Sequence, residues 1–273
     1  MVKIGRGFGV ASAIAADAIQ ASARAAESLG YAAFWVNDTS SGDGLTALAR
    51  VAAVTDCIQL GAGVIPLSRR SPASIINQVR SLTAPTAGSD ELHLPLNRLR
   101  LGVGSGSGPG GLDRVRAGIR ALKAALDMDI IIAALGPKMC RLAGEEADGV
   151  LFNWLTPKYA RTLTGYVEAG AAAAGRKSPQ RYAYVRVAFG PAAAERLSHE
   201  AAFYAGIPAY AAHFARMGVS PMDASIAADT TDALQTALDA WDGVLDQVIV
   251  RAVTAHDTTE ELLALARAAA PSG

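Results

Sequence analysis

The chain has 273 residues, of which 51% are hydrophobic and 18% are charged, with 25 basic and 25 acidic side chains. This composition excludes a disordered protein, and a net charge of zero without runs of like charge gives no indication of a nucleic-acid or membrane partner. The two cysteines, Cys57 and Cys140, form neither a disulfide framework nor a metal-ligand spacing, so we expect no metal site and a globular, cytoplasmic protein.

The N-terminal segment superficially resembles a secretory signal peptide. Lys3 and Arg6 precede a weakly apolar stretch at residues 7–16. This stretch has few strongly hydrophobic residues, however, and its apolar pattern continues at helical spacing until Gly30, a residue typical of the position just beyond a helix. We therefore expect a strand at residues 3–10, then a helix, and no secretion signal.

Predicted strands and helices alternate along nearly the whole chain. The strands are expected at residues 3–10, 32–37, 58–67, 99–104, 129–135, 150–154, 181–189 and 247–253. Helices are expected between them, and three have clear N-terminal signals, at Ser71-Pro72, at Thr156-Pro157 and in a capping box that begins at Thr258. The stretch 84–97 is the least regular and is predicted to be a loop.

Eight strand–helix units favour a closed α/β barrel. The strands are nearly continuous runs of apolar residues, as expected for a parallel sheet covered by helices. This number of units over 273 residues fits a single-domain (β/α)8 TIM barrel, spanning residues 1–273, better than an open doubly wound sheet. The alternative, a flavodoxin-like or Rossmann sheet, lacks the expected G-x-G-x-x-G after the first strand.

In such a barrel, functional residues lie on the loops that follow the strands. Asp38 follows the second predicted strand, where its carboxylate could bond a ring nitrogen of a ligand or cap a turn or helix. Gly61 and Gly63 lie within the third predicted strand. They indicate either a bulge with close approach of a ligand or packing against a large neighbour.

Two further loops offer backbone N–H groups to a phosphate. The glycine-rich stretch 102–108 suits an extended cofactor tail, although a flexible turn has the same composition. Residues 136–139 begin a predicted helix and include Lys138, which makes them the better phosphate candidate. Asn153 ends the sixth strand beside a flat aromatic residue, where the two could line a pocket for a planar ring.

Familiar catalytic sets are missing from the sequence. The histidines at positions 93, 199, 213 and 256 form no ligand pair, and His199 and His213 are predicted to lie on solvated helix faces. There is no nucleophile elbow, Walker loop or H-E-x-x-H motif. The sequence has loops suited to bind a phosphate and few candidate catalytic acids or bases. This combination indicates that a cofactor carries the reaction.

Several ordered segments carry a resemblance that covers essentially the whole chain. They lie at residues 29–38, 58–67 with 70–72, 101–106, 135–138 with 142–150, and 245–248. Together they resemble the luciferase-like monooxygenase family, and within it the F420-dependent oxidoreductase branch that includes methylene-tetrahydromethanopterin reductase-like proteins.

The resemblance implies a bacterial luciferase-like (β/α)8 barrel, a homodimer, and a flavin or deazaflavin at the C-terminal mouth of the barrel. Asp38 would contact the ring, and Asn153 would lie close to its reacting part, so these two are the candidate catalytic residues. The other expected cofactor contacts are Gly63 and Val64, as a bulge with a non-prolyl cis peptide bond, Gly104 and Ser105 beside the cofactor, and Gly136, Pro137, Lys138 and Met139 around its phosphate.

The chain departs from the family pattern at three places. Thr39 stands where many members have histidine after the strand-2 aspartate. The segment between the fourth and fifth strands is short, and residues 83–97 replace a usual hairpin. These departures bear on the substrate and on any catalytic acid more than on the cofactor, and they predict a wider or differently covered pocket.

The resemblance makes the protein an oxidoreductase that moves hydride between coenzyme F420 and an organic small-molecule substrate. Arg69 and Arg70 are candidates to receive the oligoglutamyl tail of F420. One alternative is an FMN-dependent monooxygenase, and another is a barrel that binds a flavin without turnover. A phosphate-binding aldolase or isomerase barrel ranks last, because neither a Schiff-base lysine nor a glutamate is evident at a strand end.

Overall fold

Eight parallel strands close into a barrel, as the sequence predicted. The computed structural model describes residues 5–84 and 92–271. The barrel strands are hydrogen-bonded in the order β1 (Gly7–Ala11), β2 (Ala33–Asn37), β3 (Gln59–Pro66), β4 (Leu99–Gly104), β5 (Ile130–Ala133), β6 (Gly149–Asn153), β7 (Gln180–Phe189) and β9 (Gln247–Val253), and β9 pairs with β1. Each predicted strand is present, although positions 3 and 4 of the first, and positions 85–91 of the predicted loop, lie outside the described residues.

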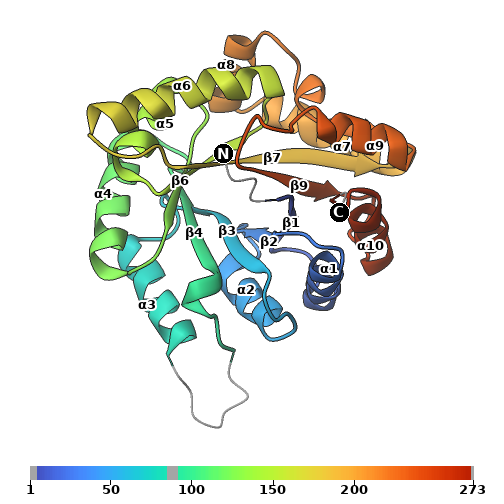
Figure 1. Cartoon of the computed structure of the whole chain (residues 1–273), viewed down its shortest axis with the longest axis horizontal. Helices are drawn as coiled ribbons and strands as arrows, with labels where there is room; N and C mark the ends of the chain where they lie inside the picture. Colours follow the sequence, from blue (N-terminus) through green and yellow to red (C-terminus); the bar gives the residue numbers. More distant parts are fainter. Residues whose placement is uncertain (1–4, 85–91, 272–273) are drawn as a thin grey trace.

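Helices surround the barrel on its outside (Figure 1). They are α1 (Ala16–Ser28), α2 (Gly44–Ala52), α3 (Pro72–Thr83), α4 (Gly111–Ala125), α5 (Pro137–Glu146), α6 (Pro157–Ala173), α7 (Pro191–Ala205), α8 (Pro208–Met217), α9 (Thr231–Asp239) and α10 (Thr259–Ala268). The predicted caps are confirmed, since the side chains of Ser71 and Thr156 accept backbone hydrogen bonds and Thr258 forms the capping box with Glu261. In the described part of the chain, every helix is too short or too polar to cross a membrane.

The segment between β7 and β9 is more elaborate than the sequence indicated. The helices expected at residues 192–217 are α7 and α8, and Pro208 begins the second of them. The short strand β8 (Ile226–Ala228) pairs with the end of β7, and α9 then leads into β9. β9 occupies one edge of β7, so β8 extends the other edge beyond the end of β6. A strand of three residues has no periodicity by which sequence could reveal it.

Aromatic side chains fill the interior of the barrel. The inner cluster contains Trp35, Tyr182 and Tyr184, packed with apolar residues of β5, β6 and β9. At the N-terminal end of the barrel, the interior is polar and closed on itself: Trp35 donates to Gln247 (2.9 Å), and Arg100 donates to the Tyr182 hydroxyl (3.0 Å). The opposite end, where the strands finish, is the mouth of the barrel, and the loops that carry function are expected there.

Helices α5 and α6 approach each other through glycines. A Cβ atom added to Gly144 would overlap the carbonyl oxygen of Val167, and one added to Gly170 would overlap that of Arg141. Gly165, on the same helix as Gly170, faces open space. The two helix backbones therefore pack at a distance that only glycine allows.

We expect Gly170→Ala to lower the free energy of unfolding by roughly 1–3 kcal/mol, because the new methyl group forces α5 and α6 apart. Gly165→Ala is the matched control and should raise stability by about 0.5–1 kcal/mol, since alanine favours the helix and meets nothing. Urea denaturation of both variants measures the difference. Equal effects of the two substitutions would contradict close packing at Gly170.

Candidate functional site

The mouth of the barrel is lined by side chains that continue the inward-facing rows of the strands. Alternate residues of a strand point to the same side, so Arg186 lies one step above Tyr184 on β7, and Arg251 lies one step above Ile249 on β9. Arg186 and Arg251 are direct partners in the register between these two strands. The pairing brings two guanidinium groups together at the mouth.

Strand β3 has a bulge at the mouth. Its register with β4 shifts between Ala62 and Ile65, and the peptide bond between Gly63 and Val64 is cis, as the family resemblance implied. A Cβ atom on Gly63 would lie 2.6 Å from the Tyr184 hydroxyl oxygen. Gly63 therefore faces the interior directly above Tyr184.

Glycines on two strands make this bulge possible. The methyl groups of Val64 lie 3.0 Å from where Cβ atoms would stand on Gly102 and on Gly104, so β4 leaves room for the displaced side chain. Gly61 has another role, because a Cβ atom there would overlap the indole of Trp35. Of the two interpretations offered for the strand glycines, packing against a large neighbour holds for both Gly61 and Gly63, and a bulge holds for Gly63 alone.

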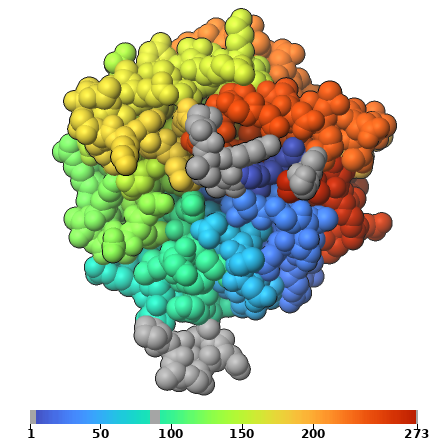
Figure 2. Space-filling model, in the orientation of Figure 1, coloured from blue at the N-terminus to red at the C-terminus, as the bar shows by residue number. Residues whose placement is uncertain are grey.

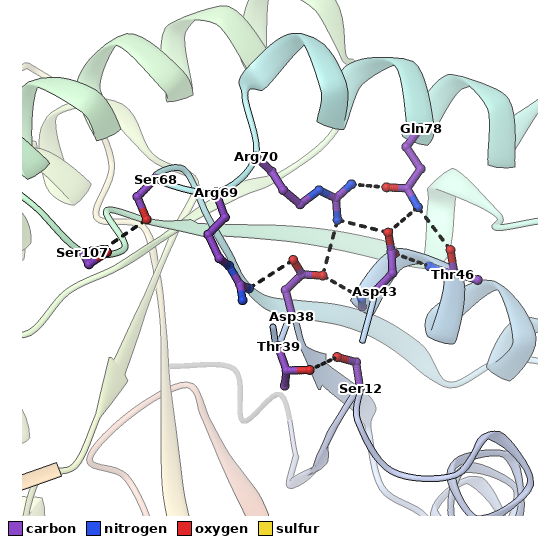
Figure 3. Close-up of polar contacts among 11 residues, drawn as sticks. Ser12, Asp38, Thr39, Asp43, Thr46, Ser68, Arg69, Arg70, Gln78 and Ser107 are labelled. Carbon is purple, nitrogen blue, oxygen red and sulfur yellow. Dashed lines mark hydrogen bonds and ion pairs between the residues drawn. The ribbon is translucent and has the colours of Figure 1, made fainter. Parts of the chain in front are cut away.

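Asp38 lies in a cluster of polar contacts at the end of β2 (Figure 3). Its side chain is only 4% exposed, and its carboxylate accepts a hydrogen bond from the backbone N–H of Gly44 at 2.7 Å. Arg69 and Arg70 each approach this carboxylate to 3.4 Å. Asp38 thus caps the turn into α2 and is paired with both arginines that follow β3.

A shallow hollow of about 430 Å³ opens beside this cluster. It is lined by residues 38–43 and by Arg69 and Arg70. The Thr39 hydroxyl oxygen, at the place where many family members have histidine, lies 3.2 Å from that of Ser12 on the loop after β1. Arg70 also forms an ion pair with Asp43 (3.4 Å) and a hydrogen bond with Gln78, so two arginines and two carboxylates share the region.

The glycine-rich loop after β4 is held by a residue that sequence reasoning missed. Arg114 of α4 donates to the carbonyl oxygens of Ser105 (3.0 Å), Ser107 (3.2 Å) and Pro109 (2.7 Å). The Ser107 N–H donates to the Ser68 hydroxyl at 3.2 Å, visible in Figure 3. These hydrogen bonds hold the loop in one conformation at the edge of the mouth. The sequence feature that could have indicated this role is the position of Arg114 in the first turn of the helix that follows the loop.

The first turn of α5 is the predicted phosphate position. Gly136 is its N-cap, Pro137 its first residue, Lys138 is exposed, and Met139 packs partly against the core. Arg216 of α8 was not predicted, yet its guanidinium lies 3.3 Å from where a Cβ atom on Gly136 would stand. A second cation is thus placed at this helix N-terminus.

The expectation that His213 lies on a solvated face is wrong. His213 is fully buried, and its ring nitrogens lie 2.7 Å from the Leu135 carbonyl oxygen and 2.6 Å from that of Trp154. Burial lowers the pKa of this imidazole, although the two carbonyl oxygens oppose the shift. His213 joins α8 to the ends of β5 and β6, while His199 is exposed as expected.

Asn153 lies at the end of β6 within a buried polar cluster. Its side-chain oxygen accepts a hydrogen bond from Arg186 at 2.5 Å, and its amide donates to the Tyr210 hydroxyl at 3.2 Å. Arg186 also pairs with Glu200 of α7 at 2.6 Å and lies over the Trp154 ring at 3.9 Å. Arg186, Glu200 and Tyr210 were not identified from sequence, since no local pattern distinguishes them from ordinary strand and helix residues.

Four buried side-chain polar atoms have no hydrogen-bond partner among the described residues: Trp154 Nε1, Thr164 Oγ1, the Asn37 oxygen and the Tyr184 hydroxyl. The last two belong to the inward-facing rows of the strands. Buried polar groups are normally satisfied, so these two atoms are available to a bound molecule. The bulge at Gly63, the glycines of β4 and the Asn37 oxygen together fit a planar heterocycle. The described residues contain no cluster of side chains suited to a metal ion.

We expect Asp38→Asn to lower the free energy of unfolding by about 1–2 kcal/mol, because it leaves Arg69 and Arg70 without the buried carboxylate between them. Asp43→Asn is the control: Asp43 is more exposed, and asparagine caps α2 as well as aspartate does. Thermal and urea unfolding should show little change for this second variant. A loss as large in Asp43→Asn would show that burial of Asp38 is not the cause.

Glu200 should make stability depend on acid pH. Burial alone would raise the pKa of its carboxyl, but Arg186, Arg251 and Arg196 outweigh burial and hold the pKa below the ordinary value of 4.5. A lowered folded-state pKa means that the stabilisation is present above the unfolded-state value and is lost as the pH falls through the folded one.

We therefore expect Glu200→Gln to cost about 1–3 kcal/mol at pH 7, and the difference from wild type to shrink as the pH falls from 6 to about 3. Glu195→Gln, on the exposed face of the same helix, should follow the wild-type pH profile. Urea unfolding at stepped pH measures both. A constant difference across this range would rule out the Glu200 carboxylate as the titrating group.

The chain is similar to known proteins in sequence and in fold. The sequence profile of the luciferase-like monooxygenase family matches residues 5–117 and 117–271. A 5,10-methylenetetrahydromethanopterin reductase from Methanolobus tindarius is 29% identical over an alignment of 181 residues. The alignment covers 56% of this chain and 55% of that protein, so the chain spans about half the length of this relative.

Two solved structures share the fold at low sequence identity. An F420-dependent secondary alcohol dehydrogenase, in complex with an F420-acetone adduct, superimposes with a TM-score of 0.77 at 13% identity, over 98% of this chain and 99% of that one. The oxygenating constituent of 3,6-diketocamphane monooxygenase from Pseudomonas putida, in complex with FMN, gives a TM-score of 0.66 at 14% identity, over 97% and 98%. With the family profile matching nearly the whole described chain, this protein belongs to the luciferase-like monooxygenase family of oxidoreductases.

Proposed function

We propose that this protein transfers hydride between the deazaflavin coenzyme F420 and a small organic substrate. The observation that carries the proposal is the β3 bulge, where Gly63 faces the interior above Tyr184. When bound, F420 supplies a planar ring that accepts or releases hydride. The residues of the mouth then have to hold that ring, bind its charged groups and present one face to the substrate.

The β3 and β4 strands supply a surface for one face of the ring. Val64 is held sideways against Gly102 and Gly104, which leaves the Gly63–Val64 backbone exposed to the mouth without a side chain above it. Gly104 and Ser105 would border the ring on the same side. The Asn37 side-chain oxygen, buried and without a partner among the described residues, is an acceptor for a ring N–H.

The first turn of α5 would bind the phosphate. The backbone N–H groups of Lys138 and Met139 belong to the first turn, where helical N–H groups have no partner within the helix, whereas Pro137 has none to give. Lys138 and Arg216 add positive charge at the same end of the helix. Two cations and free amides suit an anionic group better than either would alone.

Asp38 and Asn153 would position the reacting part of the ring from two sides. The Arg186 guanidinium orients the Asn153 carboxamide, so that its oxygen is occupied and its NH2 group remains a donor. Asp38 is held by Gly44 and both arginines, and Arg69, at the exposed edge of the hollow, is the residue best placed to meet an anionic tail. An FMN-dependent monooxygenase is the second candidate, favoured by the structural likeness to the FMN-containing camphane enzyme.

Fluorescence titrations with F420 and with FMN at matched ionic strength test the proposal. We expect the Kd for F420 to be at least about tenfold lower than the Kd for FMN, a difference in binding free energy of about 1.4 kcal/mol or more. Preference for FMN would move the protein to the oxygen-using branch of the family. Binding of neither would overturn the function proposed, and binding without turnover of any substrate would favour a carrier.

The Gly63→Ala variant tests the position of the ring. Its new methyl group meets the Tyr184 hydroxyl and Trp35, so the bulge must shift, and we expect at least about tenfold weaker F420 binding. Gly165→Ala, whose methyl group meets nothing, is the control and should bind as wild type does. Unchanged binding by Gly63→Ala would show that the bulge is not part of the cofactor site.

A further inference from the structure

The two arginines of the mouth are not equally paired. Arg186 makes an ion pair with Glu200 at 2.6 Å, a hydrogen bond to Asn153 and ring contacts with Trp154 and Tyr204. Arg251, its direct neighbour in the sheet, makes one hydrogen bond, to the backbone carbonyl of the following residue at 2.5 Å. Within residues 5–84 and 92–271, no carboxylate lies within ion-pair distance of Arg251.

The charges around this pair leave an excess of one positive charge. Glu200 is the carboxylate that acts on both arginines, and the nearby Arg196 is neutralised by its own ion pair with Asp257 at 2.7 Å. Burial lowers the pKa of Arg251, although Glu200 opposes the shift. A guanidinium stays charged at neutral pH, so it benefits from an anion that reaches it.

Tyr184, on the strand next to that of Arg251, adds a second polar group without a partner among the described residues. Its side chain spans the interior below the mouth: a Cβ atom on Gly9 of β1 would lie 2.8 Å from its ring, and one on Gly63 of β3 would lie 2.6 Å from its hydroxyl oxygen. Tyr184 is 5% exposed, and its hydroxyl has no hydrogen-bond partner among the described residues. The hydroxyl interacts electrostatically with Arg186 and Arg251. The mouth thus contains a tyrosine hydroxyl without a partner among the described residues and, on the neighbouring strand, a guanidinium without a carboxylate partner among them.

We propose that Arg251 and Tyr184 bind a carboxylate of the substrate, so that the protein acts on a small organic acid. This inference rests on the hydride-transfer function proposed above. A guanidinium binds a carboxylate through two parallel hydrogen bonds, and the tyrosine hydroxyl can donate a third. A carboxylate brings one negative charge and makes the cluster neutral, whereas a phosphate dianion would add a second charge facing Glu200. As a whole residue, Arg251 is only partly buried.

Arg251→Gln, Arg251→Lys and Tyr184→Phe test the assignment, with Arg24→Gln on the exposed face of α1 as the control. Acetate and benzoate are the probes, acetamide and benzamide their neutral counterparts, and inorganic phosphate the competing anion. Binding is followed by thermal shift, with and without saturating F420. We expect both carboxylates, and neither amide, to stabilise wild type and Arg24→Gln saturably.

Arg251→Gln should weaken carboxylate binding by about tenfold or more, equal to about 1.4 kcal/mol. Arg251→Lys, which keeps the charge and loses the paired donors, should fall between Arg251→Gln and wild type. Tyr184→Phe removes a hydroxyl without a partner, so it should fold with equal or higher stability and still bind carboxylates several-fold more weakly. Because this variant keeps the ring, loss of binding in it cannot be attributed to misfolding.

Three outcomes would overturn the assignment: equal carboxylate binding by Arg251→Gln and wild type, stronger binding of phosphate than of carboxylates, or loss of carboxylate binding when F420 is saturating. The last would show that the anion belongs to the cofactor. If wild type binds carboxylates through Arg251 and does not bind F420, the anion site stands and the proposed function fails. If F420 binds normally and Arg251→Gln changes nothing, the substrate assignment alone fails.

Discussion

The interior of an eight-stranded barrel is just wide enough to be filled by side chains, and here aromatic rings take up much of that volume. Trp35 and Tyr184 lie across the interior, and the strands that they approach carry glycine at Gly9, Gly61 and Gly63, where any larger residue would meet a ring. The β3 bulge depends on this fit. Gly63 lies above the Tyr184 hydroxyl, so one packing arrangement sets both the core of the barrel and the floor of the mouth.

The two ends of the barrel differ in whether their buried polar groups have hydrogen-bond partners. At the N-terminal end, Arg100 donates to Tyr182 and Gln59, and Trp35 donates to Gln247, so these side chains satisfy one another in two groups. At the mouth, the Asn37 oxygen and the Tyr184 hydroxyl find no partner among the described residues. A polar network that serves only folding is normally closed. Free donors and acceptors at one end therefore distinguish the binding end from the structural end.

The connection between β7 and β9 supplies much of the chemistry of the mouth. Glu200 and Tyr204 come from α7, and His213 and Arg216 come from α8. Through them, this segment contacts the ends of β5, β6 and β7, and α8 reaches the first turn of α5 through Arg216 and His213. A segment that touches both the polar cluster at Asn153 and the expected phosphate position links the two parts of the site that a cofactor and a substrate would share.

The amino-acid sequence by itself determined the barrel. Apolar runs of strand length alternate with helices that begin at a capping residue or a proline, and each of these local patterns is present in the folded chain. It also indicated Asp38, Asn153, the bulge at Gly63 and the first turn of α5, because those residues directly follow or interrupt a predicted strand. Only the tertiary structure identified Arg186, Glu200, Arg216 and His213, and only it separated the packing role of Gly61 from the role of Gly63 in the bulge. The reason is physical. Strand register and helix packing bring together side chains that are distant in the chain, and no local spacing records which charged or polar groups will meet.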